Sequence, residues 1–350
     1  MADKRPDLYN LSLPEIEALI TGWGEPSYRA KQIWTWLYRH LATSVQEMTT
    51  LPQSLRERLD EETTMYVPPV LAQQESLTGE TRKDLLKMQD GAQVEVVLMR
   101  YVDRRSACLS TQVGCALKCT FCATGQMGFE RNLSSGEIVT QALHLERELQ
   151  AQGQQLSNIV FMGMGEPFLN YEKTLEAIHR LIHPDGFRMG QRRLTLSTAG
   201  VVPGIRRFAK EDLQVNLAVS LHAATDEVRN QLLPINQRYP LNDLLAAVGE
   251  YLDRTNRQVT FEWVLIEGVN DTEEQARALA ARVAGMLVHV NLIPLNPTSG
   301  FEGQPSTPER IEAFTAILDR KHISYTLRLR RGIGIQAGCG QLRRRAQTEP

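Results

Sequence analysis

The sequence lacks any apolar run that approaches the roughly 20 residues needed to cross a bilayer. Its first residues, Met-Ala-Asp-Lys-Arg-Pro-Asp, do not form the apolar segment of a secretory signal peptide. No internal repeat or low-complexity segment stands out. These absences argue against a membrane protein, a secreted protein and a repeat array, and we expect a cytoplasmic globular protein.

An excess of charge of one sign is also missing, because 39 Lys and Arg face 41 Asp and Glu, a formal net charge of −2. This balance excludes the uniformly basic surface of many nucleic-acid-binding proteins. The distribution is uneven, however, because one acid, Glu349, and six arginines follow Leu327. The arginines are Arg328, Arg330, Arg331, Arg343, Arg344 and Arg345. Such a local basic surface can bind phosphates, although a solvated tail would have the same composition.

Cysteine is scarce, with five residues in 350, and three of the five lie within Gly114–Cys122 at C-x₃-C-x₂-C spacing. Few, clustered cysteines are typical of a reducing compartment, where thiols serve metals or catalysis. Three thiolates leave one iron of a [4Fe–4S] cube without a protein ligand, so that a substrate can bind there. This is the pattern of radical S-adenosylmethionine enzymes. A zinc knuckle or incidental thiols are the alternatives, although zinc sites usually have two separated ligand pairs.

Residues 1–64 are predicted to form a small helical domain. Four helix starts are indicated, two of them by capping boxes: Ser12–Glu15, Ser27, Ser44–Glu47 and Pro52. Helices this short need tertiary packing to persist. We therefore expect the tryptophans of this domain in its core rather than stacked on bases, namely Trp23, Trp34 and Trp36.

Residues 65–100 are predicted to form a strand-rich linker. Asp90-Gly91 is a turn signal between two short apolar runs, 84–88 and 94–98. Glu95 lies inside the second run, and buried carboxylates are uncommon without a partner or a task. The pattern alone favours an outward-facing Glu95.

From residue 101 to 335, strands and helices alternate. Apolar strand-like runs occur at 107–113, 158–164, 193–197, 215–221, 259–266, 289–295 and 325–329. Helical patterns lie between them, near 134–149, 171–182, 202–209, 241–252, 272–285 and 308–318. This alternation indicates an α/β fold with parallel strands and crossover helices. Six such units and a closing strand predict an open (β/α)₆ barrel, with its active site at the carboxyl ends of the strands.

Polar residues follow several of these strands. Gly165 and Glu166 end the second strand in a glycine-rich turn, and Glu166 can accept a hydrogen bond from an ammonium group. Similar positions after the third, fourth and sixth strands hold Ser197, Ser220-Leu221-His222 and Asn296. Each alone could be a cap, a turn or a core residue. Their shared position favours a nucleotide-binding barrel mouth.

Two further cysteines stand apart from the cluster pattern. Cys108 precedes Cys115 on the first strand, and Cys339 lies between glycines in a segment, 336–350, that follows the barrel. The flanking glycines indicate a mobile or closely approached thiol. No His, Asp or Asn signature accompanies either cysteine to indicate a hydrolase. Two unrelated buried cysteines are the alternative.

Taken together, these motifs resemble one family, the dual-specificity RNA adenine-C2 methyltransferases (RlmN type) of the radical S-adenosylmethionine class. The resemblance covers nearly the full length and is carried by six segments: 114–125, 162–167, 196–203, 220–223, 291–297 and 337–342. The adenine-C8 methyltransferases (Cfr type) share all the cysteine motifs and are the main alternative. An RNA-binding iron–sulfur sensor without turnover is an alternative of another class.

The resemblance implies a role for each motif. It implies cluster ligands at Cys115, Cys119 and Cys122, and S-adenosylmethionine contacts at Gly165, Glu166, Ser197, Ser220, Leu221, His222 and Asn296. It also implies that Cys339 is the S-methylcysteine intermediate, with Cys108 as its resolving partner in a transient disulfide. The proton acceptor would be Glu95, which reverses the preference for an outward-facing residue. Either Glu95 or Cys108 could remove the ring proton.

The implied reaction uses two S-adenosylmethionine molecules and one [4Fe–4S] cluster per chain. One molecule methylates Cys339, and reductive cleavage of the second yields a radical that activates this methyl group for addition to the adenine ring. After loss of an electron and the ring proton, Cys108 attacks Cys339 and releases the RNA. The implied substrates are 23S rRNA at the peptidyl transferase centre and tRNA 3′ of the anticodon. We also expect a flavodoxin-type electron donor, no membrane partner and a monomer.

Overall fold

The computed structural model describes residues 5–328 and 332–342. Arg328 is exposed, whereas the other arginines of the basic C-terminal segment, Arg330, Arg331, Arg343, Arg344 and Arg345, lie outside the described residues. Among the described residues, no helix is both long and apolar enough to span a bilayer.

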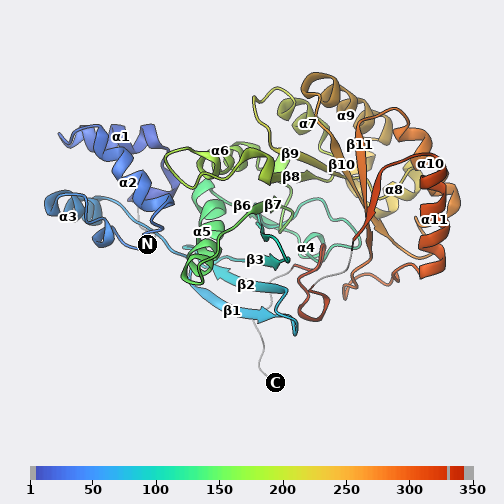
Figure 1. Cartoon of the computed structure of the whole chain (residues 1–350), viewed down its shortest axis with the longest axis horizontal. Helices are drawn as coiled ribbons and strands as arrows, with labels where there is room; N and C mark the ends of the chain where they lie inside the picture. Colours follow the sequence, from blue (N-terminus) through green and yellow to red (C-terminus); the bar gives the residue numbers. More distant parts are fainter. Residues whose placement is uncertain (1–4, 329–331, 343–350) are drawn as a thin grey trace.

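A ten-stranded sheet organises the chain, and seven of its strands are parallel neighbours in sequence order (Figure 1). These are β4 (Arg105–Cys108), β7 (Asn158–Phe161), β8 (Leu194–Thr198), β9 (Asn216–Ser220), β10 (Val259–Leu265), β11 (Val288–Pro294) and β12 (Tyr325–Leu327). The alternating pattern of the sequence therefore predicted the α/β class correctly, and the open barrel is confirmed.

The crossover helices pack on the outer side of this sheet (Figure 1). They are α5 (Ser135–Ala151), α6 (Tyr171–Ile182), α7 (Val202–Phe208), α9 (Leu241–Thr255), α10 (Glu273–Val283) and α11 (Pro308–Arg320). All six were predicted, because each buries an apolar stripe with helical spacing. Two short helices were not predicted, α4 (Ala123–Gln126) and α8 (Asp226–Leu232), since neither is long enough to show a period.

The segment 65–100 extends the large sheet with three antiparallel strands, β1 (Val70–Glu75), β2 (Thr81–Lys87) and β3 (Gln93–Arg100). Gly91 supplies the positive φ, 89°, that the predicted turn between β2 and β3 needs. Strand β3 then pairs with β4, which places Val97 opposite Cys108. The strand-rich segment is thus continuous with the barrel sheet.

The first predicted barrel strand, 107–113, is wrong as a single element. Strand β4 ends at Cys108, and β5 (Gln112–Gly114) pairs with β6 (Phe129–Asn132) in a separate two-stranded sheet. The cause is Gln141 of α5, whose side chain accepts from the Ser110 backbone N–H (2.8 Å) and donates to its carbonyl (2.9 Å). Because these bonds replace strand partners, the chain can leave the large sheet at Ser110.

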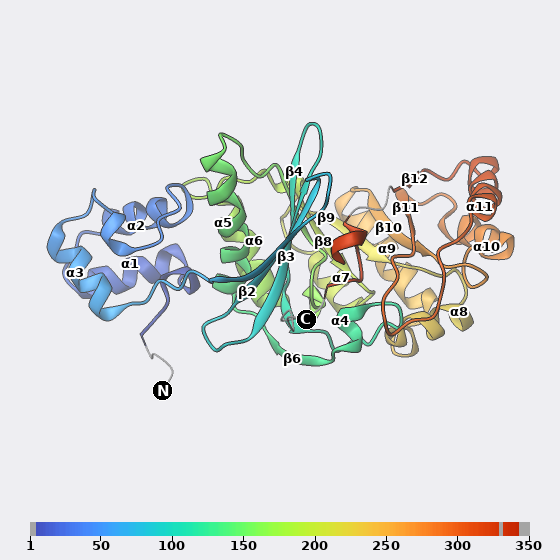
Figure 2. The same ribbon diagram turned by 90° about the horizontal axis from the view of Figure 1, so that it is seen from below.

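The N-terminal helices form a group at one end of the molecule, beside α5 and α6 (Figure 2). They are α1 (Leu13–Gly22), α2 (Tyr28–Tyr38) and α3 (Gln53–Glu62), and the capping box at Ser12–Glu15 is present as predicted. Trp34 is buried against Tyr38, whereas Trp23 and Trp36 are partly buried against the same core. Asn10 joins this group to the barrel by accepting from Gly136 N (2.9 Å) and Arg180 (2.8 Å).

Candidate active site

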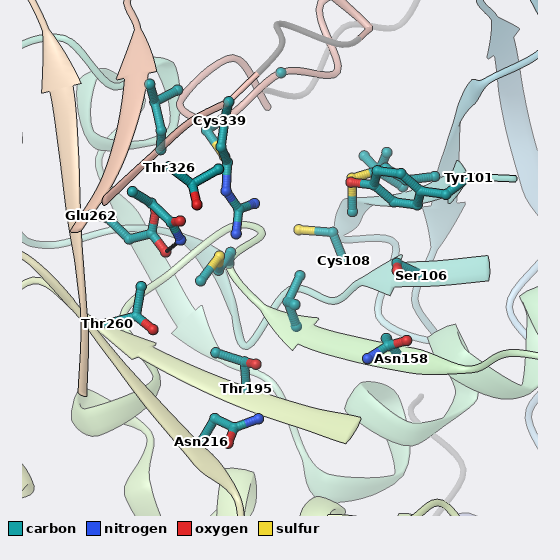
Figure 3. A pocket seen from close by; sticks show the side chains of 18 of the residues that line it. Tyr101, Ser106, Cys108, Asn158, Thr195, Asn216, Thr260, Glu262, Thr326 and Cys339 are labelled. Atoms are coloured by element: carbon teal, nitrogen blue, oxygen red, sulfur yellow. Dashed lines mark hydrogen bonds between the residues drawn. The ribbon is translucent and has the colours of Figure 1, made fainter. Parts of the chain in front are cut away.

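Two cavities open inside the barrel. A small cavity of about 160 Å³ lies at the carboxyl ends of the parallel strands and includes the three clustered cysteines in its lining. A large cavity of about 1040 Å³ runs along the barrel interior (Figure 3). The two cavities share Met162, Glu262, Ile293, Asn296 and Cys339 in their walls. Cys339 therefore lies on the boundary between them.

The cysteine loop connects β5 to α4. Its ends are tied by hydrogen bonds from Cys115 N to Gly128 O (2.8 Å) and from Cys122 N to Cys119 O (3.1 Å). Its middle is fixed by Thr120 N, which donates to Leu232 O (3.0 Å). Cys115 is buried, and Cys119 and Cys122 are partly buried. The loop thus directs three thiols into one small cavity.

Burial disfavours the charged form of these thiols when no cation is bound. Burial raises the pKa of Cys115 to about 12, and burial with repulsion from neighbouring thiols raises the pKa of Cys119. Within the described residues, no three His, Cys, Asp or Glu side chains converge on a single ion. The thiolates of an iron–sulfur cube bind different iron atoms, so that they need not converge on one point. Three thiols on one loop are also the donor set that such a cluster takes when one iron is left open.

Glu166 is held in place by backbone amides. Its carboxylate accepts from Phe168 N (3.1 Å) and Ala199 N (2.8 Å), and its own N–H donates to Gln112 (2.8 Å). Burial raises the pKa of Glu166 to about 7. The turn also needs Gly165, whose φ is +100° and where a Cβ atom would lie 2.5 Å from Gln112 Cβ. A carboxylate fixed beside the cysteine loop can accept from a ligand ammonium group.

Other predicted contact residues lie where the neighbouring strands end. Ser197, Ser220 and His222 line the small cavity with Gly165 and Glu166, whereas the Leu221 side chain is buried in the core and does not line it. His222 Nδ1 accepts from Val264 N (2.9 Å), which places the ring proton on Nε2. Burial lowers the pKa of His222 to about 3, so that the ring is neutral at pH 7. A neutral ring can donate one hydrogen bond to a ligand.

Asn296 offers an unused acceptor. Its Nδ2 donates to the Cys339 carbonyl (3.2 Å), while its Oδ1 is buried and has no hydrogen-bond partner among the described residues. A buried, unpaired carbonyl is costly unless a ligand or water satisfies it. Asn296 lines both cavities, and its free oxygen is a further sign that a polar ligand belongs there.

Sequence reasoning missed Arg229, which supports this site from behind. The residue is fully buried on α8, and its guanidinium donates to the carbonyls of Leu221 (3.0 Å), Ala199 (2.7 Å) and Ser220 (3.2 Å). Burial lowers the pKa of Arg229 to about 10. One side chain thus joins the ends of β8 and β9. No signal in the sequence indicated it, because α8 was not predicted.

Cys108 and Cys339 line the same large cavity, as their sequence separation alone could not show. In Figure 3, the Cys108 side chain projects from the end of β4 into the space below Cys339. Burial, with the nearby Cys339 thiol, raises the pKa of Cys108 to about 12. Surrounding protein and the nearby Glu262 carboxylate raise the pKa of Cys339 as well, although its side chain stays exposed. The structure therefore brings both remaining cysteines to one chamber.

Glu95 is buried, and so the outward-facing position that the pattern favoured is wrong. Its carboxylate pairs with Lys83 Nζ at 2.9 Å, and both side chains are less than a tenth exposed. Burial raises the pKa of Glu95 to about 7, although Lys83 opposes this shift. A carboxyl group that titrates near neutrality can exchange a proton at physiological pH.

The charges around the large cavity are mostly positive. Its lining includes one acid, Glu262, and four arginines: Arg104, Arg192, Arg257 and Arg328. The inner strand positions add amides and hydroxyls, among them Asn158, Thr195, Asn216 and Thr260 (Figure 3). Glu262 is nearly fully buried and accepts from Asn291 (3.0 Å). Arg328 belongs to the basic C-terminal segment that the sequence indicated, whereas the other residues were not predicted, because isolated polar positions carry no motif.

Two family models match the chain. The radical SAM superfamily matches residues 109–280, and the ribosomal RNA large subunit methyltransferase N-terminal domain matches residues 6–65. The first range contains the cysteine loop and the strands β7–β10, and the second contains α1–α3. Both the barrel and the helical group therefore have known relatives.

Several relatives match the chain over nearly its full length, and they share one name, dual-specificity RNA methyltransferase RlmN. The chain is 48% identical to a dual-specificity RNA methyltransferase RlmN 1 of Myxococcus xanthus, over 98% of this chain and 95% of that protein. It is also 48% identical to a probable dual-specificity RNA methyltransferase RlmN of Chloroflexus aurantiacus, over 96% and 92%. The crystal structure of a radical SAM methyltransferase from Sphaerobacter thermophilus superimposes with a TM-score of 0.94 at 47% identity, covering 97% of this chain and 99% of that one. The chain therefore belongs to the RlmN family of dual-specificity RNA methyltransferases.

Proposed function

We propose that this enzyme methylates carbon C2 of adenine in 23S rRNA and in tRNA, through a methyl group carried on Cys339. The observation that supports this most directly is the position of Cys339, on the boundary between the small cavity and the chamber that also holds Cys108. A methyl group taken up on one side of such a thiol can be delivered on the other. The substrates would be the peptidyl transferase centre and the adenine 3′ of the anticodon.

Membership of the radical SAM superfamily implies a [4Fe–4S] cluster and S-adenosylmethionine. We propose that Cys115, Cys119 and Cys122 hold the cluster. When bound, the pair supplies one-electron cleavage of a sulfonium, which an unactivated ring carbon requires. The proposed S-adenosylmethionine contacts are Gly165, Glu166, Ser197, Ser220, Leu221, His222 and Asn296. Leu221 would act through its backbone, because its side chain points into the core.

The chain's own residues would act in order. Cys339 accepts a methyl group from one S-adenosylmethionine, and its sulfur then joins this carbon to the adenine ring after activation by a second. Glu95 accepts the C2 proton, which its pKa near 7 permits. After the adduct has lost one electron, the Cys108 thiolate attacks the Cys339 sulfur. A disulfide forms, the bond from that sulfur to the bridging methylene breaks, and a proton converts the methylene into the methyl group of the RNA. An external flavodoxin-type donor would supply electrons.

RNA recognition would involve both parts of the molecule. The four arginines and the amides of the large cavity suit a single-stranded, anionic segment that carries the target base. We propose residues 1–64 as an RNA-recognition domain, 65–100 as the connecting strands, 101–335 as the catalytic barrel and 336–350 as the methyl-acceptor segment. A cytoplasmic monomer is the proposed state.

An anaerobic assay on rRNA and tRNA, with nucleosides separated by mass spectrometry, tests the function. We expect 2-methyladenosine in both RNAs and 5′-deoxyadenosine as a co-product. Formation of 8-methyladenosine alone would move the chain to the Cfr-type reaction. A cluster that forms no 5′-deoxyadenosine on reduction would indicate the sensor without turnover.

A further inference from the structure

The loop that carries Cys339 is anchored unevenly. After Cys339, Ala123 N donates to Gly340 O (2.7 Å) and Thr124 Oγ1 donates to Leu342 O (2.7 Å). Gln341 also donates to Pro297 O (2.8 Å). The downstream half is therefore fixed to α4 and to the segment after β11.

The upstream half depends on β2. Within the described residues 332–338, the hydrogen bond from outside the loop comes from Lys83 Nζ, which donates to Gln336 O (3.2 Å). Gln336 has a positive φ of 51°, a conformation that needs support in a residue other than glycine. The loop also lies directly on β2, because a Cβ atom at Gly332 would be 2.8 Å from Thr81 Cγ2.

The same ammonium group pairs with Glu95. In the β2–β3 register, Lys83 lies opposite Val97, and Glu95 is two residues from Val97 on the same face. Val97 and Thr81 line the large cavity, so that this face is the one turned to the active chamber. Lys83 therefore contacts two elements at once, the Glu95 carboxylate at 2.9 Å and the Gln336 carbonyl at 3.2 Å.

We propose that Lys83 is a positioning residue that joins Glu95 to the loop of Cys339. This inference rests on the proposed function for the roles of Glu95 and Cys339. Lys83 holds the proposed proton acceptor and the upstream half of the Cys339 loop in a fixed relation on one face of β2 and β3. Its ammonium group offers three donors, enough to serve both partners.

Two effects follow from removing the ammonium group. The Cys339 loop loses the hydrogen bond to its upstream half, and the buried Glu95 carboxylate loses the ammonium group that lies 2.9 Å away. In the parent, the charge of Lys83 and its hydrogen bond both lower the pKa of Glu95, against the opposing effect of burial. Without Lys83, the pKa of Glu95 therefore rises further.

The first experiment measures how firmly the loop is held, through the rate at which Cys339 is alkylated. Holoenzyme whose free Cys339 is verified by intact mass is treated with iodoacetamide, without RNA or S-adenosylmethionine, and the Cys339 peptide is followed by mass spectrometry. Lys83→Met should react about tenfold faster than the parent, as expected for losing one hydrogen bond to a charged donor. Lys83→Arg should react like the parent, and so should Lys87→Met, an exposed lysine on the same strand. If Cys339 in Lys83→Met is alkylated at a rate within about twofold of the parent, Lys83 does not anchor the loop.

The second experiment separates positioning from general loosening. Glu95 accepts a proton only when it is ionised, so that single-turnover methylation falls as pH drops through its pKa. Lys83→Met should move this acid limb to higher pH by about one unit, and Lys83→Arg should restore it. If Lys83→Met methylates more slowly at every pH but the acid limb of its pH–rate profile stays at the same pH, the role of Lys83 is purely structural. That result would contradict the proposal.

The two experiments also distinguish this inference from the proposed function. If the parent enzyme forms no methyladenosine at any pH, the proposed function fails, while alkylation of Cys339 still reports on the anchor. If the parent is active and both readouts are unchanged in Lys83→Met, the role of Lys83 fails alone. Thermal unfolding of each variant verifies that it is folded.

Discussion

The two cavities of the barrel differ in the polar groups that they present. In the small cavity, backbone amides hold both oxygens of Glu166, and Val264 N fixes the His222 ring. The large cavity instead presents four arginines and many inner amides and hydroxyls. In the proposed function, the first would bind one small ligand and the second a longer anionic partner. Variants at the boundary and on each side of it test this division.

The largest effect is expected at Cys339, which belongs to both cavities. Cys339→Ala should lower RNA methylation by at least about 1000-fold, because no other thiol on the boundary can carry the methyl group. Nucleoside mass spectrometry measures the loss.

Cys108→Ala is the matched control for this variant, because it changes the large cavity alone. It should still acquire a methyl group on Cys339 and should accumulate covalent protein–RNA adduct on denaturing gels. Turnover like that of the parent would show that Cys108 does not resolve the adduct.

The next effect concerns the support behind the small cavity. Arg229→Met should lower the free energy of unfolding by about 3 kcal/mol, because several buried carbonyls lose their donor. Chemical denaturation measures this change. Arg206→Met removes an exposed pair with Glu250 and should change stability by less than about 0.5 kcal/mol. Equal effects of the two variants would mean that Arg229 does not organise the strand ends.

A smaller effect is expected for the ligand-facing carboxylate of the small cavity. Glu166→Gln should weaken S-adenosylmethionine binding by about 10- to 100-fold, because a charge-assisted hydrogen bond is lost and an amide faces backbone donors. Calorimetry measures the change, and RNA affinity should not move. Glu172→Gln, on the exposed start of α6, is the control. If Glu166→Gln loses as much affinity for RNA as for S-adenosylmethionine, the two cavities do not bind separate ligands.

The smallest effect is expected in the large cavity. Arg104 lies over the Tyr101 ring at 4.1 Å, and both line this cavity. Arg104→Gln should weaken RNA binding a few-fold and lower the salt-dependence slope by about 0.7, the value for one phosphate contact on a single strand. Titrations at several salt concentrations measure the slope. A slope like that of the parent would exclude a phosphate contact at Arg104.

Periodicity and caps predicted most of the fold, because long amphipathic helices and apolar strands impose their own spacing. The split between β4 and β5 was not predictable in this way. It depends on one side chain, Gln141, that replaces the strand partners of Ser110 from a helix 31 residues away. Secondary-structure propensity is local in sequence and contains no information about hydrogen bonds from a distant side chain.

The candidate site shows a similar limit. Cys115, Cys119 and Cys122 were predicted as cluster ligands from their spacing, because the three thiols lie close together in the sequence. The Lys83–Glu95 pair depends on strand register, and Arg229 lies on a helix too short to recognise. The meeting of Cys108 and Cys339 was implied only by resemblance, since 231 residues separate them.

The order of the strands has a consequence for synthesis of the chain. Strands β1 to β12 of the large sheet lie side by side in the order in which a ribosome releases them, so that the sheet can grow strand by strand. The segment that reaches back to Lys83, by contrast, follows β12. Cys339, the proposed methyl carrier, therefore reaches the large cavity after the sheet strands have been synthesised. A nascent chain can complete its sheet before it has a working centre.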